Sequence, residues 1–326
     1  MRRRDFIAIA CGTVAWQRAA YAQQLKTPVI GFLSSASPDG FRVYLDMFRK
    51  ELGETGYVDD RNVAIEYRWA AGQYDRLPTL AAELVERGVS VIVATGGNPP
   101  AQAAKAATST IPIVFISGGD SIAGGLVASF SRPGGNVTAV SWLATTLVPK
   151  RLDFLRRLVP NAAVIGVLVN PSFVDHELQV RELQEAAATI GQQIKVPSSA
   201  TADGLDTALV SLVQQGARAL YVANDPYFLS RRDQIIALAA HHALPAIYFA
   251  REFAVSGGPL SYGASLADAN RQGGIYTGKV LKGALPADLP IWQPSTFELV
   301  INLKTAKALG IEVPPTIYAL ADEVIE

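Results

Sequence analysis

The residues best suited to chemistry in this chain are small polar ones that follow short, β-branched apolar runs. Three such tips occur in the first half of the chain, and they are Ser34-Ser35, Thr95-Gly96-Gly97 and Ser117-Gly118-Gly119-Asp120. The runs before them have the character of buried parallel strands, and ligands bind at the carboxyl ends of such strands. Backbone amides and hydroxyls at this edge, beside helix N-termini, suit a small anionic group. The pattern predicts that this edge forms one wall of a binding site.

The residue combinations that carry out catalysis or hold metals do not occur in the sequence. The histidines are His176, His241 and His242, and none of them belongs to a metalloprotease H-E-x-x-H pattern. Paired cysteines, a P-loop, a G-x-G-x-x-G fingerprint and a G-x-S-x-G nucleophile elbow are also missing. We therefore expect no enzyme activity, no metal site and no cofactor.

Composition narrows the range of partners. The 326 residues carry 29 basic and 29 acidic side chains, so the formal net charge is zero. Nucleic-acid binding requires a basic surface excess, and we expect no such partner. The single cysteine, Cys11, rules out an intramolecular disulfide.

Residues 1–22 have the layout of a secretory signal peptide. Basic Arg2–Arg4 is followed by the apolar stretch Phe6–Trp16 and by the small-residue cleavage motif Ala20-Tyr21-Ala22. The segment Arg3–Ile7 resembles a twin-arginine export motif, and the sequence leaves open whether this route or the general secretory route applies. We expect the mature protein to work in a bacterial periplasm.

From residue 27 onward the chain alternates strand-like runs and amphipathic helices in two successive series. This alternation is typical of parallel sheets with helical crossovers. The predicted fold is α/β, with two Rossmann-like lobes whose parallel sheets are joined by a multi-strand hinge. We expect residues 28–142 plus about 258–290 in lobe 1, and residues 143–257 plus about 291–326 in lobe 2. Crossings of this kind leave a cleft along the facing strand ends.

Several segments together carry a family resemblance. They are Asn62–Ala71 (NVAIEYRWAA), Arg132–Thr138 (RPGGNVT), Ser230–Ala243 (SRRDQIIALAAHHA), Leu244–Tyr248 (LPAIY) and Phe297–Gly310 (FELVINLKTAKALG). With these segments the chain resembles the substrate-binding proteins of bacterial ABC transporters that have the type I periplasmic-binding fold. Within them it is most similar to the family of tryptophan/tyrosine-type binding proteins. The resemblance implies a protein that closes on a small solute and presents it to a membrane permease.

In proteins of this kind the ligand lies between the lobes, so the resemblance implies contacts at the strand-end loops. The candidates are Ser34, Ser35, Thr95, Gly96 and Asp120 on the first lobe, and Phe173, Asp225 and Tyr248 on the second. We expect Ser35 and the Thr95-Gly96 amides to hold a carboxylate, and Asp225 or Asp120 to pair with an ammonium group. Phe173 and Tyr248 are expected to stack on an apolar or planar side chain.

Each candidate also has a structural alternative. Ser34 and Ser35 fit the capping of the next helix, and Asp225 before Pro226 is a common turn pair. The Thr95-Gly96 tip fits a simple turn, whereas Phe173 and Tyr248 fit packing inside their own lobe.

The leading hypothesis is a periplasmic solute-binding component of an ABC importer. Its ligand is expected to be an amino acid, with the aromatic ones among the candidates, and its partner is an ABC permease in the inner membrane. We expect it to act as a monomer. One alternative is a sensor of the same fold that feeds a membrane receptor, and a more distant one is an exported enzyme. The sequence leaves the identity and affinity of the ligand open.

Overall fold

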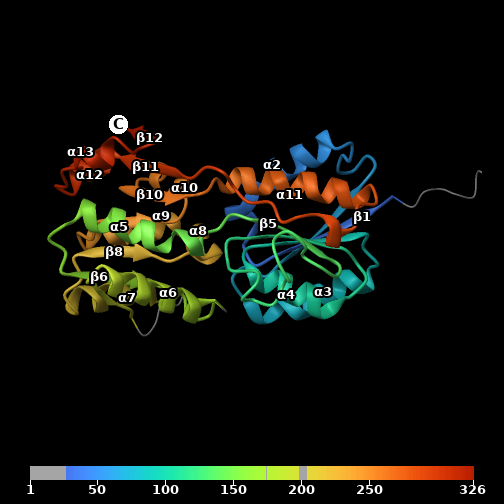
Figure 1. Cartoon of the computed structure of the whole chain (residues 1–326), viewed down its shortest axis with the longest axis horizontal. Coiled ribbons are helices and arrows are strands. Elements are labelled where there is room, and N and C mark those ends of the chain that lie inside the picture. The colour runs from blue at the N-terminus through green and yellow to red at the C-terminus, as the bar shows by residue number, and fades with distance from the viewer. Residues whose placement is uncertain (1–26, 174, 198–203) are drawn as a thin grey trace, which may run out of the picture.

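The computed structural model describes residues 27–173, 175–197 and 204–326. It contains two α/β lobes that lie side by side along the long axis of the molecule (Figure 1). The prediction of an α/β fold with largely parallel sheets is confirmed. The predicted signal peptide, residues 1–22, lies outside the described ranges. Within those ranges, no helix is both long enough and apolar enough to span a membrane.

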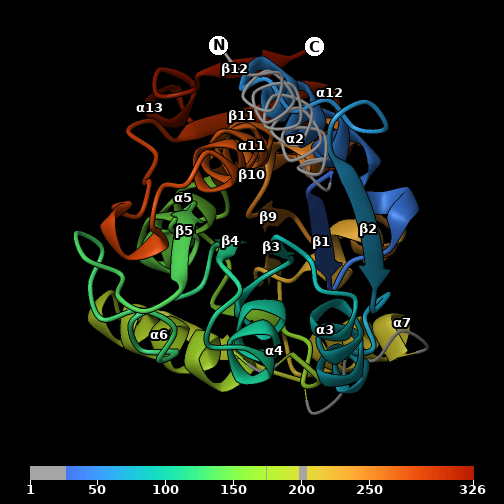
Figure 2. The ribbon, with the colours of Figure 1, turned by 90° about the vertical axis from the view of Figure 1, so that its right-hand side faces the viewer.

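Lobe 1 is built on a five-stranded parallel sheet in the order β2-β1-β3-β4-β5. Its strands are β1 (Val29–Ser34), β2 (Ala64–Trp69), β3 (Val91–Thr95), β4 (Ile113–Ser117) and β5 (Val137–Ser141). All residues of β3, β4 and β5 are buried, because helices cover both faces of the sheet. One face carries α2 (Pro38–Glu54) and α11 (Leu266–Leu281), and the other carries α3 (Leu77–Glu86) and α4 (Asn98–Ala107) (Figure 2).

Lobe 2 is built on a seven-stranded sheet in the order β12-β11-β10-β9-β8-β6-β7. Its strands are β6 (Val164–Leu168), β7 (Gln193–Lys195), β8 (Ala219–Val222), β9 (Ala246–Tyr248), β10 (Leu260–Gly263), β11 (Glu298–Asn302) and β12 (Glu323–Ile325). Only the β10-β11 pair of this sheet is antiparallel among the described strands.

Helices cover both faces of the second sheet as well. One face packs against α5 (Val148–Leu158) and α6 (His176–Thr189), and the other against α7 (Leu205–Gln214), α9 (Arg232–His241) and α10 (Arg251–Val255). The short helix α8 (Pro226–Ser230) follows β8, and α12 (Leu303–Ala308) and α13 (Pro315–Tyr318) lie near the C-terminus. Each lobe thus has helices on both faces of its sheet, which leaves strand ends as the places for a site.

The crossings between the lobes differ in one place from the expected boundaries. We expected residues from about 258 onward in lobe 1, but β10 pairs with β9 and β11 in the second sheet. The return to lobe 1 therefore falls at Ala264-Ser265, just before α11. On the way back to lobe 2, Trp292 bridges to Val140 of β5, so the last crossing follows Trp292. The other boundaries stay a prediction.

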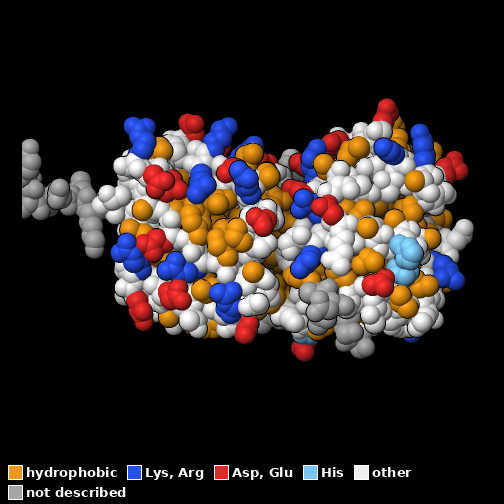
Figure 3. Space-filling model, turned by 180° about the vertical axis from the view of Figure 1, so that it is seen from behind, with side chains coloured by type: hydrophobic (Ala, Val, Ile, Leu, Met, Phe, Trp, Pro, Cys, Tyr) orange, Lys and Arg blue, Asp and Glu red, His pale blue; other side chains and the backbone are white. Residues whose placement is uncertain are grey.

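The surface agrees with the balanced composition. Figure 3 shows basic and acidic side chains interspersed over both lobes, with a notch between the lobes. This face therefore has no broad basic patch of the kind that holds a nucleic-acid backbone.

Candidate ligand-binding site

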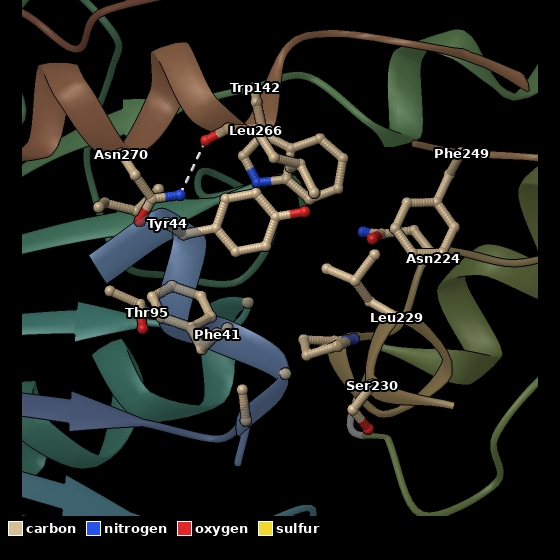
Figure 4. A pocket seen from close by; sticks show the side chains of 16 residues that line it. Phe41, Tyr44, Thr95, Trp142, Asn224, Leu229, Ser230, Phe249, Leu266 and Asn270 are labelled. Atoms are coloured by element: carbon tan, nitrogen blue, oxygen red, sulfur yellow. Dashed lines mark hydrogen bonds between the residues drawn. The ribbon is translucent and has the colours of Figure 1, made fainter. Parts of the chain in front are cut away.

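A pocket lies between the lobes, beside the ends of β3 and β8 (Figure 4). Its labelled lining residues are Phe41, Tyr44, Thr95, Trp142, Leu266 and Asn270 from elements of lobe 1 and its crossings, and Asn224, Leu229, Ser230 and Phe249 from lobe 2. The cavity volume is about 50 Å³. The pocket is therefore narrow, which favours a flat ligand.

Aromatic rings form much of the pocket wall. Phe41 and Tyr44 lie one turn apart on α2, with ring centroids 5.3 Å apart. Trp142, at the first crossing, approaches Phe249 of lobe 2 with centroids 6.2 Å apart and ring planes at 31°. Rings from both lobes around one narrow space can stack on a planar group.

Thr95 and Gly96, two of the predicted contacts, line the pocket at the end of β3. Ser34 and Ser35 lie behind them and do not belong to the lining. Thr95 Oγ1 donates to Ser34 Oγ at 3.0 Å, and Ser35 Oγ donates to the carbonyl oxygen of Gly96 at 2.7 Å. Both serine hydroxyls thus join the ends of β1 and β3. In this conformation the Ser35 hydroxyl proton is used in the bond to the turn, and the expected contact of Ser35 with a ligand carboxylate stays a prediction.

The turn after β3 needs glycine. Gly96 and Gly97 have φ angles of 88° and 96°, in the left-handed region that side chains disfavour. A Cβ atom on Gly96 would also clash with the Ser35 hydroxyl. Gly97 is the N-cap of the ten-residue helix α4, and Pro99 and Pro100 in its first turn carry no N–H, so this helix end offers fewer backbone donors than usual.

Asp225 lies at the N-terminus of α8, outside the pocket lining. Its Oδ1 accepts a hydrogen bond from the Tyr227 amide at 2.6 Å and from the Tyr74 hydroxyl at 3.1 Å. Burial raises the pKa of Asp225 to about 6. Tyr74 belongs to lobe 1, so Oδ1 links the lobes, whereas the buried Oδ2 has no hydrogen-bond partner among the described residues. The pairing of Asp225 with an ammonium group stays a prediction.

Phe173 also lies at the interface between the lobes. Its ring lies 5.6 Å from the Tyr74 ring, centroid to centroid, and a Cβ atom on Gly97 would lie 3.2 Å from it. The side chain is buried and does not belong to the pocket lining. Phe173 therefore packs across the lobe interface behind the β3 turn, which neither sequence alternative anticipated.

Asp120 is held by its own turn. Its Oδ1 accepts hydrogen bonds from the amides of Ile122 and Ala123, both at 2.9 Å, and it lies outside the pocket lining. Asp175 of lobe 2 lies close enough to be affected by its charge. Burial first, and then the negative charge of Asp120, raise the pKa of Asp175 to about 6. This part of the lobe interface is therefore sensitive to pH.

Tyr248 lies in the core of lobe 2 and not in the pocket. It is fully buried, and its ring stacks on Phe253 with centroids 4.5 Å apart. The next residue, Phe249, lines the pocket, because successive residues of an extended chain point to opposite sides. A similar offset of one residue separates the predicted Asp225 from the lining residue Asn224.

Asn270 is a lining residue that sequence reasoning missed. Its Nδ2 donates to the carbonyl oxygen of Leu266 at 2.8 Å, which fixes the orientation of the amide because a carbonyl oxygen only accepts. The Oδ1 atom is buried and has no hydrogen-bond partner among the described residues. This oxygen has almost no accessible surface, so a ligand in the pocket does not reach it in this conformation, and Asn270 lines the pocket with its other atoms. Only the packing of α11 against α2 brings this residue to the pocket.

Among the described residues, the pocket lining contains no Asp, Glu, Lys or Arg. Glu252 of lobe 2 interacts with the Tyr44 hydroxyl, and burial together with this negative charge raises the pKa of Tyr44. In the described part of the chain, no group of three His, Cys, Asp or Glu side chains is placed to hold a metal ion.

Comparisons with known proteins identify relatives among substrate-binding proteins of ABC transporters. A family model described as ABC transporter substrate binding protein matches residues 22–325. A tyrosine-binding protein from Clostridioides difficile (strain R20291) is 30% identical over 266 residues, which cover 81% of this chain and 76% of that protein.

Two solved structures have similar sequence identity to the chain but different TM-scores. An ABC domain from Streptococcus pneumonia in complex with L-Trp has a TM-score of 0.82 and 27% identity, covering 92% of this chain and 100% of the other. A substrate-binding protein with adhesive properties from Clostridium difficile, in its ligand-free, open structure, has a TM-score of 0.65 and 26% identity, covering 92% and 99%.

Proposed function

The chain belongs to the family of ABC transporter substrate-binding proteins, and from this premise we propose that it is the periplasmic solute receptor of an ABC importer. The proposed ligand is a small aromatic solute that binds between the lobes. The observation that carries the proposal is a narrow, largely apolar pocket lined by residues of both lobes at their strand ends. The predicted signal peptide, residues 1–22, supports export, and the proposed partner is the permease of the inner membrane.

The proposed mechanism is hinge closure. A ligand that contacts Thr95 and Tyr44 on one lobe and Asn224 and Phe249 on the other gains its full set of contacts only when the lobes are together. Such a ligand favours the closed state by its differential affinity for that state. The permease would then distinguish the loaded receptor by its closed shape.

The similarity to solved structures supports the idea that the described conformation is the closed one. The L-Trp complex and the ligand-free, open structure have nearly equal identity to this chain and equal coverage of it. The TM-score is nevertheless 0.82 for the complex and 0.65 for the open structure. A difference in the angle between lobes accounts for such a gap, because rigid rotation of one lobe lowers the overlap of the whole chain.

Contacts across the cleft are consistent with closure. Tyr74 of lobe 1 donates to Asp225 of lobe 2 at 3.1 Å. At the start of α2, a Cβ atom on Gly40 would lie 3.1 Å from the Cβ of Ser230 on α8. These contacts join surfaces that an open hinge would separate.

The aromatic nature of the ligand follows from the lining. Phe41, Tyr44, Trp142 and Phe249 supply rings from both lobes to a narrow space. Relatives named for tyrosine binding and crystallised with L-Trp support the same class of solute. We propose binding without chemical conversion, since the lining lacks a nucleophile paired with a base.

The test is a ligand screen with the mature protein. Purified protein is titrated with aromatic acids, aromatic amino acids, sugars and aliphatic amino acids, while Tm and tryptophan fluorescence are recorded. A solute at 100 times its Kd should stabilise the protein by about 2.7 kcal/mol, which raises Tm by several degrees. Small-angle scattering with and without the solute then reports compaction. If no small solute raises Tm, the proposed function loses its basis.

A further inference from the structure

The strand-end segment Ser117–Asp120 lies outside the pocket lining, but it packs against a residue that belongs to the lining. Gly118 follows the end of β4 directly, and the indole of Trp142 lies against it. A Cβ atom built on Gly118 would lie 2.5 Å from Cε2 and 2.6 Å from Cζ2 of this indole. Trp142 lines the pocket, whereas Gly118 does not. The absence of a side chain at Gly118 therefore makes room for one wall of the pocket.

The glycine at position 118 is required by space and not by backbone conformation. Its φ angle lies outside the left-handed region, in contrast to those of Gly96 and Gly97, so strain at φ does not exclude a side chain. Carbon atoms in contact lie about 3.5–4.0 Å apart, so an added Cβ would have to push the Trp142 indole away by about 1 Å.

The backbone around Gly118 is held in place by hydrogen bonds. The Trp142 amide donates to the carbonyl oxygen of Ser117 at 3.0 Å, and the Thr145 amide donates to the carbonyl oxygen of Gly118 at 3.2 Å. The Gly119 amide donates to Ser117 Oγ at 3.1 Å. Because these bonds fix the backbone on both sides of Gly118, an added side chain should displace the indole instead.

A displaced indole would move into the pocket. The Trp142 side chain is only 8% exposed, and the free space beside it is the pocket that it lines. Phe249 of lobe 2 also lines this space, and its ring centroid lies 6.2 Å from that of the indole (Figure 4). A movement of about 1 Å matters in so narrow a space, because packed groups tolerate little overlap.

On the basis of the proposed function, we propose that Gly118 is a positioning residue for ligand binding: it seats the Trp142 indole and so sets the width of the pocket for an aromatic ring. Gly118 acts through Trp142 and does not touch the ligand. The segment that the sequence singles out as a wall of the site thus contributes, at Gly118, through the space that it leaves empty.

The test is a double-mutant cycle between Gly118 and Trp142. Calorimetric titration with L-tryptophan and L-tyrosine compares mature wild-type protein, Gly118→Ala, Trp142→Leu and the double variant. For the probe that wild-type protein binds more tightly, Gly118→Ala should raise Kd at least about tenfold, within the range that overpacking costs. In the Trp142→Leu background it should change Kd less than about twofold, because leucine lacks the Cε2 and Cζ2 atoms that the new Cβ would meet.

A second neighbour of Gly118 supplies the competing explanation. The added Cβ would also lie 2.8 Å from the Cβ of Ala144. This overlap remains in the Trp142→Leu background, so a loss of about tenfold that persists there assigns the effect to Ala144 and overturns the inference. An Ala144→Gly background removes this overlap, and Gly118→Ala should still weaken binding in it.

Gly166→Ala is the matched control for overpacking. A Cβ atom on Gly166 would lie 2.9 Å from Leu212 in the core of lobe 2, and neither residue lines the pocket. Gly166→Ala should lower Tm and leave the Kd of both probes within about twofold of wild type. A change in Kd as large as that of Gly118→Ala would show that overpacking anywhere in the chain weakens binding, which overturns the inference.

Two measurements on Gly118→Ala need no ligand. Its crystal structure should show the Trp142 indole displaced by about 1 Å toward the pocket, and an indole that has not moved overturns the inference. If Gly118→Ala lowers Tm too far for titration, the cycle is read from Tm instead. Trp142→Leu should then reduce the loss of Tm that Gly118→Ala causes, and an equal loss in both backgrounds contradicts the proposed role.

Failure of this inference is distinguishable from failure of the proposed function. If wild-type protein binds an aromatic probe and folded Gly118→Ala binds it equally well, the positioning role is refuted and the receptor remains. If wild-type protein responds to no solute in the whole screen, the proposed function is contradicted, and the role of Gly118 in ligand binding fails with it.

Discussion

Replacement of Tyr74 by phenylalanine should weaken ligand binding without unfolding either lobe. In the described conformation the Tyr74 hydroxyl of lobe 1 donates to Asp225 Oδ1 of lobe 2 at 3.1 Å. Tyr74→Phe removes this hydroxyl and keeps the ring that packs against Phe173 with centroids 5.6 Å apart. The lost bond exists only when the lobes are together, so the substitution acts on closure.

The magnitude follows from the chemistry of the bond. A hydrogen bond to a charged group contributes about 1.5–3 kcal/mol. In the variant, Asp225 Oδ1 still accepts a hydrogen bond from the Tyr227 amide at 2.6 Å. We therefore use the lower end of that range. A loss of about 1.5 kcal/mol reduces the ratio of closed to open molecules about tenfold. If the closed state is the binding-competent one, Kd rises by the same factor.

The assay is calorimetric titration of wild-type and variant protein with the tightest solute from the screen. Tyr318→Phe is the matched control, because Tyr318 is 48% exposed and lies far along the chain from the cleft-lining segments. We expect Kd to rise about tenfold for Tyr74→Phe and to stay within twofold for Tyr318→Phe. An unchanged Kd for a folded Tyr74→Phe protein would show that the Tyr74–Asp225 bond does not couple to ligand binding.

Three further outcomes are expected. Burial raises the pKa of Asp175 to about 6 in the closed conformation, and opening would return it toward about 4, so closure takes up a proton. Affinity should therefore increase as the pH falls through about 6 and stay at its lower value above about 7. Asp175→Asn should weaken this pH dependence and leave the part that comes from Asp225, whose pKa burial also raises to about 6. A flat wild-type profile in titrations at several pH values contradicts the reasoning. Gly96→Ala should lower the free energy of unfolding by about 2 kcal/mol or more, from backbone strain and the clash with Ser35. Gly134→Ala has similar strain without a clash, so it should cost about 1 kcal/mol in thermal unfolding, and equal losses argue against the clash. Tyr248→Phe removes a buried hydroxyl that has no hydrogen-bond partner among the described residues, so Tm should stay equal or rise and Kd should not change; weaker binding would return Tyr248 to the site.

Much of the fold could be predicted because its signals are local. β-Branched runs such as Val91–Thr95 can be stable only when both faces are covered, and the amphipathic stretches between them supply the cover. Parallel connections of this type are almost always right-handed, which leaves few topologies. The predicted return to lobe 1 came too early because β10 gains hydrogen bonds from both β9 and β11, and the sequence does not state pairing partners.

The candidate site was predicted less well, because the direction in which a side chain points, and not its place in the sequence, decides whether it lines the pocket. Thr95 and Gly96 were predicted and line the pocket, since a strand end forces them to the edge. Tyr248 and Asp225 lie beside the lining residues Phe249 and Asn224, because a step of one residue turns a side chain to the other side. Phe41 and Tyr44 have helical spacing that predicts a core face, and the same face continues into the pocket.

The sequence by itself determined that this chain forms alternating strands and helices with polar strand ends, because periodicity and turn chemistry act over a few residues. It also carried the family resemblance. Only the tertiary structure decided which polar groups are free to meet a ligand. The Ser35 hydroxyl and Asp225 Oδ1 are bonded to residues about 60 and 150 positions away, and Asn270 reaches the pocket on a helix that follows the return of the chain from the other lobe. Hydrogen-bond satisfaction is a property of the packed chain, and it therefore selects the binding groups from among residues of equal chemistry.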